Sequence, residues 1–145
     1  MKSRMKLQQP NMTHRQLFGY SRRQALERRH LLDITPVARQ ALMEVPLAIT
    51  PALWRSVARD DPFRIEDPRL LSLCFATFMS LTGPSTREEF SPFCHTVWFE
   101  AAVSGQRVSL KLMTHPGDGP GPVMTLLTAE EKGLSELDAG RVSAS

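Results

Sequence analysis

Long apolar runs and cysteines are scarce in this sequence. The longest apolar-rich segment, Leu70–Leu81, is interrupted by polar residues and is shorter than the roughly 20 residues of a membrane-spanning helix. The two cysteines, Cys74 and Cys94, provide no disulfide framework. Residues 1–16 are polar and no apolar run follows their basic start, so we expect neither a secretory signal nor a membrane span. These absences favour a cytoplasmic protein.

Motifs of metal sites and of common catalytic centres are also lacking. The residue types that bind zinc occur without a C-x-x-C or H-x-x-x-H spacing, as Cys74, Cys94, His95 and His115. Cys94 and His115 are the candidate pair of nucleophile and base. The favoured alternative is that the cysteines are ordinary buried thiols. We therefore expect a non-enzymatic protein with no catalytic residues, no metal and no cofactor.

The segment His115–Pro122 contains three glycines and three prolines. Its glycines leave backbone N–H groups open to a phosphate group. However, the segment lacks the Gly-Lys-Ser/Thr ending of a P-loop, precedes a predicted strand and contains Asp118. A hairpin loop shaped by proline and glycine is the favoured interpretation.

The 145 residues, 41% hydrophobic and 23% charged, have the size and composition of one soluble globular domain. We expect a flexible basic arm over residues 1–16, a single α+β domain over residues 17–128 and a polar C-terminal tail over residues 129–145.

Capping residues and prolines mark the predicted helices. Ser21 is expected to cap a short helix over Arg22–Arg29. Thr35-Pro36 and Thr50-Pro51 each place a capping hydroxyl before a proline at the first helical position, which predicts helices over residues 37–43 and 51–58. Pro68 opens a longer helix, whose expected apolar face consists of Leu70, Leu71, Cys74, Phe75, Phe78 and Met79.

Two short extended segments, residues 31–34 and 45–49, precede a region in which apolar residues alternate with polar ones. Residues 97–103 and 108–112 flank the tight turn Ser104-Gly105-Gln106, and residues 123–128 return as a further strand. The predicted fold class is α+β, with three or four short helices packed on a small antiparallel sheet that ends in a three-stranded meander.

The charge is unevenly distributed along the chain. Residues 1–32 contain eight Lys and Arg residues and one acid, a formal charge of +7, whereas residues 33–145 contain ten and fourteen, a charge of −4. Phe18 and Tyr20 lie among the basic residues as candidate stacking groups. A solvated helix face, with Tyr20 in the core, is an equal alternative. The predicted partner-binding residues are Arg15, Tyr20, Arg22, Arg23, Arg28 and Arg29.

Seven short segments occur in a distinctive order: Tyr20–Leu26, Leu32–Thr35, Ala38-Arg39, Pro46–Thr50, Ala52–Trp54, Leu110–Leu112 and Pro116–Gly119. Their order resembles an uncharacterised family of small bacterial proteins, found on plasmids, integrative elements and phage-like regions. Arg28-Arg29-His30 departs from the Asp-Gly turn that members usually have, and residues 60–92 match only in outline. The resemblance implies no activity. It implies a mobile genetic element, where small proteins manage the host and include anti-CRISPR and anti-restriction proteins.

The preferred hypothesis is a mobile-element accessory protein that binds and inhibits a host defence complex, such as a CRISPR-Cas or restriction system. Its expected partner is a host protein or ribonucleoprotein complex, with direct nucleic-acid contact and no membrane. One alternative is a nucleic-acid-binding regulator that uses the same basic N-terminal third. A third is an enzyme of unrecognised class that uses Cys94, His95, His115 or Asp118.

Overall fold

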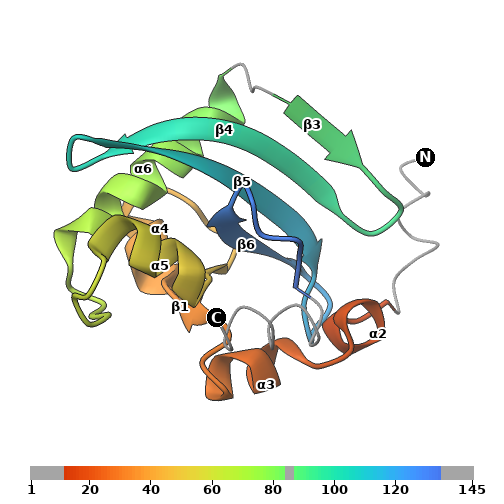
Figure 1. The fold of residues 1–145 in the computed structure, drawn as a ribbon. Helices are drawn as coiled ribbons and strands as arrows, with labels where there is room; N and C mark the ends of the chain where they lie inside the picture. Colours follow the sequence, from red (N-terminus) through yellow and green to blue (C-terminus); the bar gives the residue numbers. More distant parts are fainter. Residues whose placement is uncertain (1–11, 84–86, 135–145) are drawn as a thin grey trace.

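The computed structural model describes residues 12–83 and 87–134, and these form a mixed α+β fold (Figure 1). Most of the predicted arm and tail, residues 1–11 and 135–145, lies outside the described residues. Folded structure begins earlier than expected, because a helix starts at His14. No helix in the described ranges has the length and apolar character needed to cross a membrane.

The helices in these ranges are α2 (His14–Phe18), α3 (Arg22–Glu27), α4 (Thr35–Gln40), α5 (Pro51–Ala58) and α6 (Pro68–Thr82). The strands are β1 (Leu32–Asp33), β2 (Leu47–Ile49), β3 (Arg87–Phe90), β4 (His95–Val103), β5 (Gln106–Pro116) and β6 (Pro122–Thr128).

Local hydrogen bonds explain where α3 and α5 begin. The Ser21 side chain accepts a hydrogen bond from the Gln24 N–H, and the Gln24 side chain accepts one from the Ser21 N–H, which makes a capping box. Thr50 caps α5 by accepting from the Leu53 N–H, with Pro51 at the first helical position. Both capping predictions are therefore confirmed.

Thr35 does not cap α4 as predicted. The N-cap position is Ile34, and Thr35 is already helical. The Thr35 hydroxyl donates to the Asp33 carboxylate at 2.6 Å and accepts from the Leu47 N–H at 3.1 Å. Its side chain therefore joins the start of α4 to β2 instead of closing the helix end.

The six strands form one sheet in the order β1-β2-β6-β5-β4-β3. Strands β4, β5 and β6 pair antiparallel in sequence order, and Ser104 and Gly105 make the β4–β5 turn with φ of 52° and 80°. The sheet is mixed rather than antiparallel, because β2 runs parallel to β6. The edge strand β3 was not predicted, because its four residues are all exposed and show no alternation.

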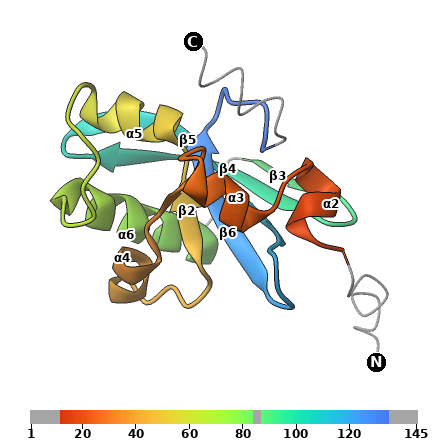
Figure 2. The same cartoon turned by 90° about the horizontal axis from the view of Figure 1, so that it is seen from below.

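Helices cover the two faces of the sheet unequally (Figure 2). The first face packs against α4, α5 and α6 in an apolar core that includes Leu53, Leu73 and Leu126. Side chains along each strand point alternately to the first and to the second face. The second face carries Met113 and Leu127, which pack with Tyr20, Ala25 and Leu31 in a smaller cluster. The N-terminal layer, which we define as helices α2 and α3, lies over this second face.

The buried side of α6 agrees with the predicted one only in part, since Leu70 and Cys74 are buried and Leu71 and Phe78 pack against the core. Phe75 and Met79 are 46% and 64% exposed, whereas the buried stripe follows i, i+3, i+4 and i+7 spacing as Leu70, Leu73, Cys74 and Thr77. Thr77 is tolerated there because its hydroxyl donates to the Leu73 carbonyl. Since α6 is apolar nearly all round, its sequence does not determine which side meets the sheet.

Candidate functional site

Helix α3 begins against the carboxylate of Asp118, which lies in the β5–β6 loop. The two Asp118 oxygens accept hydrogen bonds from the backbone N–H groups of Arg22 and Arg23, at 2.8 and 2.9 Å. A helix leaves its first N–H groups without internal partners, and the dipole at that end favours a negative charge. This loop, for which the sequence favours a hairpin loop over a phosphate cradle, therefore uses its own carboxylate to fasten α3 to the sheet.

The Arg22 side chain points into the protein. Its Nη1 donates to the Thr125 hydroxyl at 3.2 Å and its Nη2 donates to the Met124 carbonyl at 3.0 Å, both on β6. Burial lowers the pKa of Arg22 to about 10, although the carboxylates of Asp33 and Asp118 oppose this shift. Arg22 therefore remains charged at neutral pH and is stabilised by hydrogen bonds to the sheet.

His115 continues this network on β5. Its Nδ1 lies 3.0 Å from the Pro116 carbonyl, which can only accept, so Nδ1 carries the proton. Its Nε2 therefore accepts from the Thr125 hydroxyl, 2.9 Å away. Burial lowers the pKa of His115 to about 3, and the charge of Arg22 adds to this effect. The side chain is neutral, with its tautomer fixed by two hydrogen bonds.

His14 attaches α2 to the same corner of the sheet. Its backbone N–H donates to the Gly117 carbonyl at 3.0 Å, and its ring Nδ1 donates to the Tyr20 carbonyl at 2.7 Å. Burial lowers the pKa of His14 as well. A Cβ at Gly117 would lie 2.7 Å from a methyl carbon of Val123, so a larger residue there would force the Val123 side chain to move. The polar groups that hold the N-terminal layer, here called the anchor cluster, are the buried His14, Arg22, His115 and Thr125 together with the exposed Asp118.

Four arginines of the N-terminal layer and the turn after it are exposed: Arg15, Arg23, Arg28 and Arg29. We call them the basic surface. The ion pair of Arg23 with Glu27, at 3.5 Å, is solvent-exposed and so contributes little to stability. The Arg28 guanidinium lies 5.9 Å from the centre of the Tyr20 ring. Four guanidinium groups are therefore displayed on a segment that the anchor cluster fixes to the sheet.

Two of the six predicted partner-binding residues are not at the surface. Tyr20 is 2% exposed and packs in the second-face cluster, and Arg22 is 7% exposed because its guanidinium bonds to β6. The helix predicted over Arg22–Arg29 is also shorter than expected, since α3 ends at Glu27 and Arg29 has φ of 63°. The sequence did not distinguish Arg22 from Arg23, because their partners on β6 and in the β5–β6 loop are about 100 residues away.

The cysteines do not have the environment of a nucleophile. Burial raises the pKa of the Cys74 thiol to about 12 and also raises that of Cys94, whose Sγ lies 3.6 Å from the Thr96 hydroxyl. A reactive thiol needs a lowered pKa. In the part of the chain that the structure describes, no group of three or more His, Cys, Asp or Glu side chains is placed to hold a metal ion.

Comparison of the chain with protein-family models, curated proteins and solved structures gives no match. The likeness of its short segments to a mobile-element family therefore stays a resemblance. The role of the chain has to be inferred from its own contacts and charges.

Proposed function

We propose that this chain is a non-enzymatic accessory protein that binds and inhibits a host nucleoprotein complex, such as a CRISPR-Cas complex or a restriction nuclease. The observation that supports this proposal best is the attachment of the basic surface. The anchor cluster holds α2 and α3 by hydrogen bonds to the sheet and the β5–β6 loop, so the arginines start from a fixed backbone instead of a flexible arm. A fixed backbone lowers the entropy that is lost when a partner binds.

The chemistry of the basic surface favours a partner rich in phosphate or carboxylate groups. A guanidinium group presents a planar set of donors that matches both groups bidentately. The first 32 residues carry a formal charge of +7 against −4 for the rest, so this part of the chain is the source of a positive field. Such a field speeds the approach of a polyanion and orients the chain toward it.

Inhibition requires only that the chain cover a surface that its partner needs. Arginine is among the residues that most often dominate the free energy of an interface. The resemblance to mobile-element proteins supports a host defence system as the target, because mobile elements benefit from inhibitors of host nucleases. An accessory protein of this kind needs no catalytic centre.

A nucleic-acid-binding regulator is the second candidate, and the same basic surface supports it. The two functions differ in what remains bound when free nucleic acid is removed. Direct binding to duplex DNA also predicts a log–log salt slope of about −0.9 for each phosphate neutralised. Binding that is mainly to protein predicts a weaker salt dependence and resistance to nuclease.

The test is capture of host complexes from a lysate by the tagged full chain, with and without nuclease. The main variant carries Arg15→Gln, Arg23→Gln and Arg29→Gln, and keeps Arg28 because of its contact with Tyr20. The control carries Arg39→Gln and Arg55→Gln, which remove exposed charges from α4 and α5 on the other side of the sheet.

We expect the unmodified chain and the control to retain one nuclease-resistant complex, and the triple variant to lose it with an unchanged melting temperature. Loss of all captured material on nuclease treatment would support the regulator instead. Equal capture by the triple variant and the control would contradict both.

A further inference from the structure

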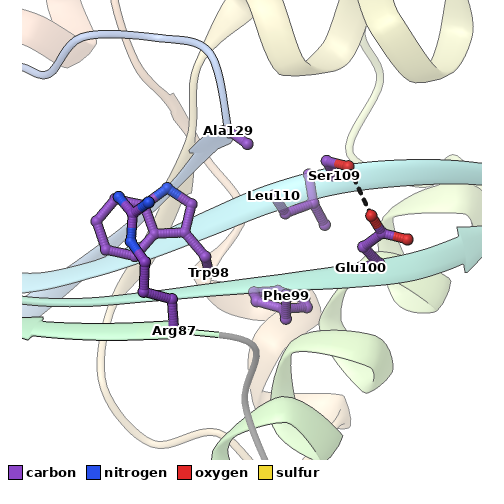
Figure 3. Close-up of a pocket in the computed structure, with 7 residues that line it drawn as sticks. All are labelled: Arg87, Trp98, Phe99, Glu100, Ser109, Leu110 and Ala129. Carbon is purple, nitrogen blue, oxygen red and sulfur yellow. Dashed lines mark hydrogen bonds between the residues drawn. The ribbon is translucent and has the colours of Figure 1, made fainter.

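The N-terminal layer covers only part of the second sheet face. Beyond it, β4 and β5 present Trp98, Glu100, Ser109 and Lys111 on that face, since Trp98 pairs with Lys111 and Glu100 with Ser109. A shallow pocket of about 200 Å³ lies there. Figure 3 shows Arg87 against the ring of Trp98, and the bonded pair Glu100 and Ser109 further along the strands.

The Trp98 ring has a basic side chain near it from each of the two neighbouring strands. Arg87 is its partner on β3, and the guanidinium carbon lies 3.7 Å from the centre of the indole. Lys111 is its partner on β5, with Nζ 5.9 Å from the same point. Nucleobases stack on aromatic rings and on guanidinium planes. Because the Arg87 guanidinium lies over the Trp98 ring, the flat, positively charged platform at the surface is the exposed Arg87 side chain, supported by Trp98.

The charges around the platform favour an anionic ligand. Arg87 lines the pocket, Arg107 lies next to it through its bond to Glu100, and the buried Lys111 donates to the Glu131 carbonyl. Glu100 already accepts hydrogen bonds from Arg107 at 2.8 Å and from Ser109 at 3.2 Å. Arg87 has an exposed ion pair with Glu89 at 3.5 Å, which is a weak competitor. A Lys or Arg side chain from a protein partner would meet like charge here.

We propose that this pocket binds one unpaired nucleotide of a single-stranded nucleic acid. The base stacks on the Arg87 guanidinium, which is itself stacked on Trp98, and the phosphate interacts with the arginines at the rim. The volume suits one base and is too small for a paired duplex to enter. This inference rests on the proposed function, because a nucleoprotein complex is the partner that presents unpaired nucleotides.

Intrinsic fluorescence of Trp98 reports whether a base binds at the Arg87–Trp98 pair. The chain has two tryptophans, and Trp54 is 4% exposed with its Nε1 bonded to the Asp61 carbonyl. Twelve-nucleotide oligo(U) and oligo(dT), and a twelve-base-pair duplex, are titrated into the full chain. The Trp98→Phe variant contains only Trp54 and provides the background signal.

We expect both single strands to quench the Trp98 signal to saturation, and the duplex to leave it unchanged. The ratio of the oligo(U) and oligo(dT) affinities identifies whether RNA or DNA is the better source of the nucleotide. If neither oligo(U) nor oligo(dT) quenches the Trp98 signal at saturating concentration, the proposal is overturned.

Anisotropy with labelled strands measures the contribution of the platform to affinity. Trp98→Ala is expected to weaken single-strand binding by about 5- to 150-fold, the range for loss of one base–aromatic stack. Trp98→Phe retains an aromatic face and is expected to lose less, and Arg39→Gln, on α4, is expected to lose nothing. Thermal melting checks that each variant is folded. Equal affinities for Trp98→Ala and Trp98→Phe would overturn the proposal.

The two proposals fail in different ways. If the triple arginine variant loses the host complex while Trp98→Ala binds oligonucleotides normally, the proposed function stands and the nucleotide pocket is wrong. If Trp98→Ala weakens oligonucleotide binding while the triple variant captures the complex fully, the pocket stands and the basic surface is wrong. Loss of a nuclease-treated protein complex by Trp98→Ala alone would show that the pocket binds protein instead.

Discussion

The two faces of the sheet are held to their helices by different forces. Against α4, α5 and α6 the contacts are almost entirely apolar, whereas the N-terminal layer is attached by a small apolar cluster together with the anchor cluster. Apolar burial is non-directional and scales with area, while hydrogen bonds fix distance and angle. The first face therefore provides most of the stability, and the second provides the position of the basic surface.

The largest effect is expected from breaking the first face. Leu126 is fully buried at the centre of β6, between β2 and β5. Leu126→Ala should lower the free energy of unfolding by about 2 to 5 kcal/mol, because it removes buried methyl groups and leaves a cavity. Urea unfolding followed by circular dichroism measures this loss. A loss below about 1 kcal/mol would mean that the apolar core is not what holds this face.

A smaller and more local effect is expected from Arg22→Met. This change keeps much of the apolar packing of the side chain but removes both donors to β6, leaving the Met124 carbonyl without its Arg22 partner. A hydrogen bond that involves a charged group contributes about 1.5 to 3 kcal/mol. Hydrogen exchange should show faster exchange in residues 14–31 and unchanged protection in α6. Equal loss of protection in both regions would contradict separate roles for the two faces.

Lowering the pH should weaken the attachment of the N-terminal layer to the second face. The pKa of His115 is about 3 in the folded chain, whereas the unfolded value is near 6.5, so the unfolded state binds more protons between these values. Stability is therefore full above pH 6.5 and falls as the pH is lowered toward 3, by at most about 1.4 kcal/mol per pH unit. Because the pKa of His14 is also lowered, this residue acts in the same direction.

The control for this pH effect is His115→Asn, which removes one titrating ring. Urea midpoints measured from pH 7 to pH 4 should fall less steeply for the variant than for the unmodified chain. Parallel pH dependences would show that His115 does not contribute to the acid sensitivity.

Local sequence signals predicted the elements that local contacts determine. The side chains of Ser21 and Thr50 each accept a hydrogen bond from the backbone N–H three residues later, which is a local contact. The turn at Ser104-Gly105 is also local, because it needs two residues with positive φ. The pairing of β2 with β6 could not be predicted from the sequence, because β2 has three residues and its partner lies far along the chain.

The candidate site was predicted only in part. The excess of arginine was visible in the sequence, and Arg15, Arg23, Arg28 and Arg29 are indeed exposed. The sequence did not show that Arg22 turns inward, because the two β6 oxygens it meets are brought near by folding. Asp118 resembled an obstacle to phosphate binding, and only the fold places it at the start of α3.

The contact between Asp118 and α3 also constrains when the basic surface assembles. The two partners are 96 residues apart, so the N-terminal layer leaves the ribosome long before the loop that fastens it. At about 5 to 20 residues per second, that interval is roughly 5 to 20 seconds. The N-terminal layer is made first and can dock only after β5 and β6 exist. A nascent chain that stalls before Asp118 therefore displays its arginines without the geometry that a partner would recognise.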